Sequence, residues 1–263
     1  MASGPPHPAP PHRLKKLQPG HGVRAAIITA KGRLEADTRI AATTEALFLE
    51  TDFSLRENIR SRLEKFIVAD DVAIEDLSES FHLAHIPGLN QPPSGSPADS
   101  LSFQCARFRE PGLDLWTTSP SDWKPDSTPL KEWEALRIAR GLPLWNLDVG
   151  PDTLPPEAGF ETDAISSTKG CYIGQEVISR LRSVGHVNRH LCILGSRLTP
   201  STCPDFFLPA PCTSADGKTV GTLTSLASMD GQTLALAMIK REQAQPGNSV
   251  LAGGAVWTIL RHA

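Results

Sequence analysis

The sequence predicts an α+β protein whose last part is a small antiparallel β-barrel or sandwich. Up to about residue 187, β-prone runs alternate with stretches whose apolar residues recur at helical spacing. From residue 188 onward, short β-rich runs alternate with Pro and Gly turns. The 263 residues are 40% hydrophobic and 21% charged, a composition that allows one large core or two smaller ones.

The first elements are a β-hairpin, a third strand and a helix. Two β-prone runs flank Lys31-Gly32, as in a hairpin with a Gly-containing turn. Apolar residues at helical spacing predict a helix from Leu55 to Ile67, with Ser54 as its N-cap. In this first part of the chain, strands are expected at 23–30, 33–40, 46–50, 72–77 and 81–85.

The middle and last elements follow a loop rich in Pro, Gly and Ser at 87–100. A strand pair is expected at 101–108 and 113–118. A helix is expected at 130–140, because Gly141 and Pro143 are typical of a helix end, and a second helix at 173–182. The final strands are expected at 191–194, 220–226, 233–239 and 255–260.

These patterns divide the chain into three segments. Residues 1–13 are Pro-rich and lack hydrophobic anchors, which predicts a disordered tail. Residues 14–187 are expected to form the α+β domain, and residues 188–263 the β-rich domain.

Charge and cysteine usage exclude several classes of protein. A net charge of −3 gives no general attraction to nucleic acid, and no stretch reaches the roughly 20 apolar residues of a membrane span. Direct nucleic-acid binding and membrane insertion are therefore not expected. We expect a cytoplasmic protein whose thiols are reduced. The cysteines predict no metal site, because none of them forms a CxxC pair or has a nearby His at metal-ligand spacing. They are Cys105, Cys171, Cys192, Cys203 and Cys212.

The densest group of functional side chains lies between 166 and 180. Gly170 and Gly174 bracket Cys171, and Lys169 lies two positions before Cys171, close enough for its charge to favour the thiolate if the two side chains converge. Glu176 and Arg180 are four residues apart and share a face of the expected helix. From the residues alone, a small buried cysteine beside a surface ion pair is the alternative interpretation.

One signature carries a family resemblance: Lys169-Gly170-Cys171-Tyr172-Ile173-Gly174-Gln175-Glu176, followed by Arg180. It resembles that of the YgfZ-type folate-binding proteins, relatives of the glycine-cleavage aminomethyltransferase. The resemblance extends over about residues 14–263. Further stretches that are similar to the family are 29–33, 140–143, 154–160, 217–225 and 235–241.

The resemblance implies an aminomethyltransferase-like α+β folate-binding region followed by a small C-terminal antiparallel β-barrel. It implies tetrahydrofolate or a one-carbon derivative as cofactor, with Glu157 accepting hydrogen bonds from the pterin. It also implies a role in assembly or repair of iron–sulfur enzymes, and a link to tRNA modification, with iron–sulfur client or assembly proteins as partners. Cys171 and Lys169 would carry the characteristic activity, supported by Gly170, Tyr172, Gly174, Gln175, Glu176 and Arg180.

The sequence departs from the family at its start. Relatives begin with a strand, a helix and an Asn-Asp element, whereas here the match starts at Leu14. The aspartate that aminomethyltransferases place near the reacting folate nitrogen therefore has no expected counterpart. A conventional aminomethyltransferase is accordingly the second hypothesis, and a scaffold of the same fold without folate is the third.

Overall fold

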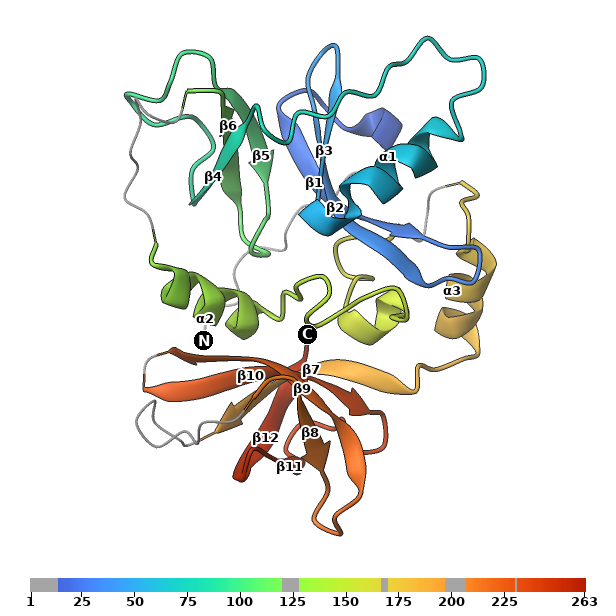
Figure 1. Ribbon diagram of the computed structural model, residues 1–263, viewed down its shortest axis with the longest axis vertical. Helices are drawn as coiled ribbons and strands as arrows, with labels where there is room; N and C mark the ends of the chain where they lie inside the picture. Colours follow the sequence, from blue (N-terminus) through green and yellow to red (C-terminus); the bar gives the residue numbers. More distant parts are fainter. Residues whose placement is uncertain (1–13, 120–127, 167–169, 197–206, 230) are drawn as a thin grey trace. The chain divides into compact units, whose positions relative to one another are not determined.

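The computed structural model describes residues 14–119, 128–166, 170–196, 207–229 and 231–263 (Figure 1). The expected tail at 1–13 and Lys169 of the signature lie outside these residues. The chain divides into two compact units, each made of separate segments. The sheet unit comprises 1–27, 36–127 and 163–169; the barrel unit comprises 28–35, 128–162 and 170–263.

The sheet unit is built on a six-stranded sheet in the order β3-β2-β1-β5-β6-β4 (Figure 1). β1 pairs with β5 in parallel, and the pairs β2–β3, β5–β6 and β4–β6 are antiparallel. Helix α1 (Arg56–Glu64) follows β3 along the chain. The strands are β1 (His21–Ile28), β2 (Leu34–Ala42), β3 (Leu47–Thr51), β4 (His82–Pro87), β5 (Leu101–Cys105) and β6 (Gly112–Thr117).

Aromatic packing contributes to the core of the sheet unit. Phe103 is fully buried on β5, and Trp116 on β6 meets it edge-on at a centroid distance of 6.2 Å. Phe48 on β3 contacts both rings, at 5.8 Å and 5.7 Å. Such tilted and edge-to-face pairs stabilise a core beyond the area that they bury.

Two sequence-based expectations for the sheet unit are wrong. Ser54 is not a helix N-cap: its N–H donates to the Asp52 carboxylate, which caps the short 3-10 helix Phe53–Leu55 ahead of α1. The run 72–77 is an exposed loop and not a strand. A β-prone sequence forms a strand only where a neighbouring strand pairs with it, and this run has no such partner.

The barrel unit contains a closed barrel in the order β10-β7-β12-β11-β8-β9 (Figure 1). Trp257, Leu223 and Ala237 are fully buried in its core. The sequence does not reveal β8 and β11, which are only four residues long. The strands are β7 (Arg189–Ser196), β8 (Ala210–Thr213), β9 (Thr219–Met229), β10 (Gln232–Lys240), β11 (Ser249–Ala252) and β12 (Ala255–His262).

Two helices precede the barrel strands within the barrel unit. α2 (Leu130–Arg140) has the bounds that the sequence predicts and ends at Gly141, whose φ of 68° suits glycine. α3 is Gln175–Ser183. The domain boundary near residue 188 stays a prediction, because the compact barrel unit also takes in both of these helices.

A buried network of hydrogen bonds and ion pairs connects α2 to the barrel. The guanidinium of Arg137, 1% exposed, donates to Asp148 at 2.8 Å and to the Ser225 hydroxyl at 2.7 Å. Asp148 also accepts from the hydroxyls of Thr224 and Ser225. Because each buried charge has several partners, the network is a stabilising structural feature of the unit.

Candidate functional site

Two glycines fix the signature loop against the turn of the first hairpin, within the barrel unit. Gly174 precedes α3 with a φ of 81°, and a Cβ there would lie 2.4 Å from the carbonyl oxygen of Thr29. A Cβ on Gly32 would lie 2.8 Å from Cγ1 of Val177. Neither position accepts a side chain without displacing its neighbour, so the close contact requires glycine on both sides.

The loop presents Cys171 to solvent. Cys171 and Gly170 are both exposed, whereas Tyr172 is half-buried, and its burial raises the pKa of its hydroxyl. Gln175 holds this segment: its side-chain oxygen accepts the N–H of Tyr172 at 3.2 Å, and its own N–H donates to the Tyr172 carbonyl. The structure thus brings the signature residues 170–175 together around an accessible thiol.

Glu176 and Arg180 lie on α3 as expected, and both are exposed. No ion pair joins these two described residues. The pair that forms nearby is Arg182 with Glu161, at 3.0 Å between Nε and Oε1. This contact links α3 to the loop that follows the 3-10 helix Pro155–Ala158.

Glu157 is buried, with 6% of the residue exposed, and both carboxylate oxygens have partners. Oε2 accepts the N–H of Leu154 at 2.9 Å, which caps the 3-10 helix, and Oε1 lies 3.0 Å from Nε of Arg189. These contacts account for a carboxylate at this position on structural grounds. Its assignment as a folate ligand stays a prediction.

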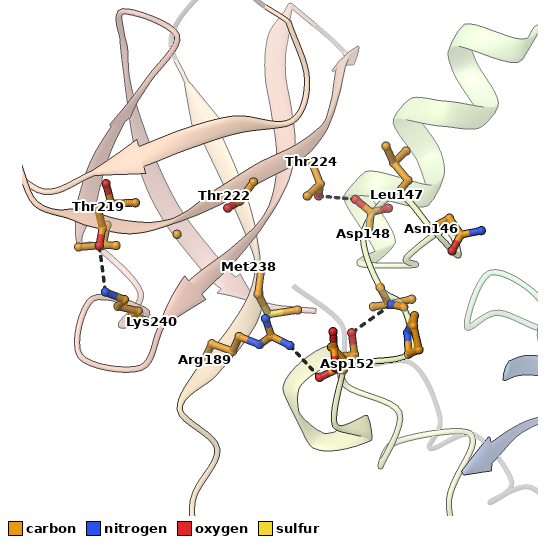
Figure 2. Close-up of a pocket in the computed structure, with 16 residues that line it drawn as sticks. Asn146, Leu147, Asp148, Asp152, Arg189, Thr219, Thr222, Thr224, Met238 and Lys240 are labelled. Atoms are coloured by element: carbon orange, nitrogen blue, oxygen red, sulfur yellow. Dashed lines mark hydrogen bonds between the residues drawn. The ribbon is translucent and has the colours of Figure 1, made fainter. Parts of the chain in front are cut away.

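A shallow pocket of about 610 Å³ lies on the barrel unit, between the 146–153 loop and strands β9 and β10 (Figure 2). Figure 2 shows Arg189 donating to the carbonyl of Asp152 and Lys240 donating to the carbonyl of Thr219, at 3.0 Å and 3.1 Å. Both basic groups therefore have backbone partners. Cys171 and Glu157 are not among the lining residues.

The sheet unit holds a charged cluster that sequence reasoning missed. Arg24 on β1 has a largely buried side chain, with Nη2 at 2.7 Å from Asp37 and Nη1 at 3.1 Å from Asp163. Burial disfavours the charged guanidinium, but the two carboxylates outweigh it and raise the pKa of Arg24. The charge of Arg24 is thereby compensated inside the unit.

Arg39 on β2 belongs to the same cluster but lacks an acidic partner at salt-bridge distance among the described residues. Its Nη2 donates to the carbonyl of Arg107 at 3.2 Å. Burial, reinforced by the positive charges of Arg107 and Arg24, lowers the pKa of the Arg39 guanidinium. A guanidinium in this setting gains more from an anionic ligand than a solvated one does.

The other half of the cluster surrounds Asp114 on β6. His85 Nδ1 lies 2.8 Å from Oδ1 of Asp114, and Arg107 donates to both Asp114 oxygens at 3.1 Å and 2.7 Å. Arg107 also forms a two-pronged pair with Glu50, at 2.9 Å and 2.6 Å. Burial opposes ionisation of Asp114, but the bonds from His85 and Arg107 outweigh it and lower its pKa.

Cys105 completes this group, with Sγ 3.7 Å from Nδ1 of His85. Burial, and after it the negative charge of Asp114, raises the pKa of the Cys105 thiol to about 12. Local spacing does not predict the cluster. Strand pairing brings His85 to Asp114, 29 residues away, and the ion pair between Arg107, in the turn after β5, and Glu50 joins residues 57 apart. One sequence feature could have indicated the cluster: Asp114 is an acidic residue inside an apolar strand, between Leu113 and Leu115.

Several known proteins are similar to this chain, although no protein-family profile matches it. A chloroplastic protein of Arabidopsis thaliana named as a transferase is 36% identical over 46% of the chain. The tRNA-modifying protein YgfZ of Colwellia psychrerythraea is 34% identical over 25%, and the mouse mitochondrial iron–sulfur cluster assembly factor IBA57 is 26% identical over 56%. The chain covers 27%, 21% and 44% of these relatives, less than half the length of each.

The comparison of folds covers more of the chain. The glycine cleavage system aminomethyltransferase T of Bartonella henselae superposes with a TM-score of 0.71, over 93% of this chain and 76% of that one, at 17% identity. This likeness confirms the expected fold class: an aminomethyltransferase-like α+β region and a closed six-stranded antiparallel barrel.

Two broader expectations from the sequence concern the location of the protein. No helix in the described residues is long and apolar enough to span a membrane. The relatives include one chloroplastic and one mitochondrial protein, and nothing in the comparisons points specifically to the cytoplasm.

Proposed function

We propose that this protein binds a tetrahydrofolate-type ligand and supports iron–sulfur enzymes, with the Cys171 thiol as its functional group. One observation carries the proposal: Cys171 stands exposed on a loop that two glycine contacts hold in place. Cys192 and Cys212, by contrast, are buried in the barrel, and burial raises the pKa of each to about 12. Chemistry at a thiol requires access, and Cys171 has it.

The relatives support the iron–sulfur part of the proposal. IBA57 is named as an iron–sulfur cluster assembly factor, and YgfZ as a tRNA-modifying protein. We propose that this protein acts with iron–sulfur client or assembly proteins in the cytoplasm, and that any effect on tRNA follows from the state of such enzymes. Four free cysteines among the described residues fit a reducing compartment.

The charged cluster of the sheet unit fits the chemistry of a folate. A pterin edge presents N–H donors, for which the carboxylates of Asp37 and Asp163 are suitable acceptors. The glutamate tail of a folate is anionic and complements the guanidinium of Arg39, which has no acidic partner at salt-bridge distance in the part of the chain that the structure describes. We therefore propose Arg39, Asp37 and Asp163 as folate contacts within the sheet unit, as an alternative to Glu157, which the sequence proposes in the barrel unit.

The thiol proposal is tested by complementation. Cys171→Ser is expected to fold normally and to fail to restore an iron–sulfur enzyme in cells that lack the native gene. Ser179→Ala, an exposed change on the neighbouring α3, is the matched control and is expected to complement. Full complementation by a folded Cys171→Ser protein would remove the thiol from the function.

Folate binding is tested by isothermal titration with tetrahydrofolate. If folate binds in the sheet unit, Arg39→Ala is expected to weaken binding by about 1–3 kcal/mol, the scale of a lost hydrogen bond to a charged group. If it binds at Glu157 in the barrel unit, Glu157→Ala is expected to weaken binding by about the same amount. Arg60→Ala removes an exposed arginine of α1 and is expected to leave the affinity unchanged. No binding by the parent chain would refute the folate assignment, and loss confined to one variant would decide between the two sites.

A conventional aminomethyltransferase is the competing activity. It would release ammonia from an aminomethylated carrier protein in the presence of tetrahydrofolate. We expect no ammonia above the no-enzyme rate, and steady release would favour the enzyme over the accessory role.

A further inference from the structure

Three strands of the sheet unit bring a thiol, an imidazole and a carboxylate onto one face. His85 on β4 is directly opposite Asp114 on β6. Cys105 on β5 is opposite Gly112, two residues before Asp114 on β6. Because side chains of a strand alternate between faces, residues 112 and 114 share a face, and so do their partners on both sides.

Gly112 opens the space in which the three side chains meet. A Cβ on Gly112 would lie 2.5 Å from Cε1 and 2.8 Å from Nε2 of His85, so any side chain there would displace the imidazole. Without it, the ring lies over the glycine and its Nδ1 faces Cys105 at 3.7 Å from Sγ. The glycine thus sets the position of the imidazole between the two other groups.

The arrangement does not suit a nucleophilic triad. A triad needs the base to contact the nucleophile through one ring nitrogen and the orienting carboxylate through the other. Here the same nitrogen, Nδ1, faces both Asp114 and Cys105. Convergence of three different donor atoms on one point is instead the geometry of a metal site.

We propose that His85, Cys105 and Asp114 form a binding site for a borderline-soft divalent cation such as Zn²⁺. The donors are Nδ1, Sγ and a carboxylate oxygen, which all lie within 4.8 Å of one another. With metal–ligand bonds of about 2.0–2.3 Å, donor atoms of a tetrahedral site are about 3.3–3.8 Å apart. The distance from Sγ to Nδ1 already matches, and that from Nδ1 to Oδ1 has to open from 2.8 Å by roughly half an ångström.

The charges and protons of the site balance around a divalent ion. Near the three donors, the carboxylates of Glu50 and Asp114 are paired with the guanidinium of Arg107. Metal binding releases the Cys105 proton to solvent and requires that Nδ1 of His85 carries no proton. The Cys105 thiolate and the Asp114 carboxylate then offset the two positive charges of the cation, which lowers the cost of placing it in a partly buried setting.

The surroundings supply what a ligating carboxylate needs. Arg107 donates to both oxygens of Asp114 and is itself held by Glu50. Such outer contacts orient ligands and tune affinity at metal sites. Three protein ligands leave a fourth position for water or an external ligand, as in exchangeable zinc sites.

Cobalt(II) is the probe, because a thiolate bound to Co²⁺ gives a charge-transfer absorption band that oxygen and nitrogen ligands do not give. Titration of the metal-free full chain with Co²⁺ is expected to produce this band at one ion per chain, and Zn²⁺ is expected to abolish it by displacement. A folded parent chain that gives no such band would overturn the proposal.

Variants locate the site. Cys105→Ser is expected to remove the band, whereas Cys171→Ser, which changes the exposed thiol of the barrel unit, is expected to retain it. Gly112→Ala keeps all three ligands but displaces the imidazole, and is expected to weaken Co²⁺ binding by about 10–100-fold. Thermal melts without metal establish that each variant folds. If Cys105→Ser does not fold, the Gly112→Ala variant is the deciding test. Unchanged Co²⁺ affinity in a folded Gly112→Ala chain would refute the site. Loss of the band in Cys171→Ser would also refute it.

Discussion

Cys171 differs from the other described cysteines in its access to solvent. Cys192 and Cys212 are buried, and Cys105 is half-buried beside Asp114. We therefore expect iodoacetamide to alkylate Cys171 faster than these three thiols, and Lys169→Ala to slow the reaction because a positive charge favours the thiolate. Peptide mass spectrometry measures each rate separately. Equal rates for Cys171 in the parent and in Lys169→Ala would exclude the lysine from activating the thiol.

At this scale the sequence reveals one kind of site and misses another. The signature around Cys171 is contiguous, so eight neighbouring residues are enough to detect it. The contact between His85 and Asp114 is made by pairing of β4 with β6, and local spacing in the sequence does not show it. Glu157 is predicted from the sequence as a folate ligand, but its carboxylate already contacts the N–H of Leu154 and the guanidinium of Arg189.

The link between α3 and the hairpin turn depends on glycine at position 174. Gly174→Ala is expected to destabilise the protein by about 1–3 kcal/mol, because the residue has a positive φ and a Cβ would strike the Thr29 carbonyl. Gly170→Ala is the matched control: it lies in the same loop with open space around it, and its stability is expected to change little. Urea unfolding of the three proteins gives the free energies, and equal destabilisation by both changes would refute the packing argument.

Strands β7 and β12 carry a stacked pair of histidines. The rings of His190 and His262 are 4.2 Å apart and nearly parallel, and His262 donates to the Ala244 carbonyl. Burial, followed by the charges of His262 and Arg241, lowers the pKa of His190 below its ordinary 6.5. The fold therefore favours the neutral ring. The stability that this gives is complete above about pH 6.5 and is lost as the pH falls toward the folded-state pKa.

A variant at this stack tests the sign of the effect. His190→Phe keeps a ring but cannot be protonated, so it is expected to lose less unfolding free energy than the parent when the pH falls through about 6.5 to 5.5. Denaturant titrations at several pH values measure the difference. His186→Gln, which alters an exposed histidine, is expected to follow the parent. A parallel pH profile for His190→Phe would contradict the prediction.

Elements with strong local periodicity were predictable, and short or unpaired ones were not. α2 has both an apolar stripe and a glycine end, and its bounds agree with the prediction. β8 and β11 are too short to show alternation, and they exist because barrel closure pairs them with longer strands. The run 72–77 has the composition of a strand but no partner, and it stays a loop.

The whole molecule should resist proteolysis unevenly. The barrel is closed, so its backbone groups are paired all round, whereas the loop at 88–100 is largely exposed. Limited subtilisin digestion is expected to cut 87–100 or the first 13 residues before it cuts β7, β9 or β10. Mass spectrometry of early fragments identifies the sites. Early cuts scattered through 191–239 would contradict a compact C-terminal domain.

The buried pair between Arg24 and Asp163 has a consequence for how the chain is made. The two residues are 139 positions apart, although they belong to the same compact unit. A ribosome that adds about 5–20 residues per second delivers Asp163 roughly 7–30 s after Arg24. During that interval the carboxylate of Asp163 is not yet available to compensate the charge of Arg24. The sheet unit, whose first residues emerge first, is therefore completed while the barrel unit is being synthesised.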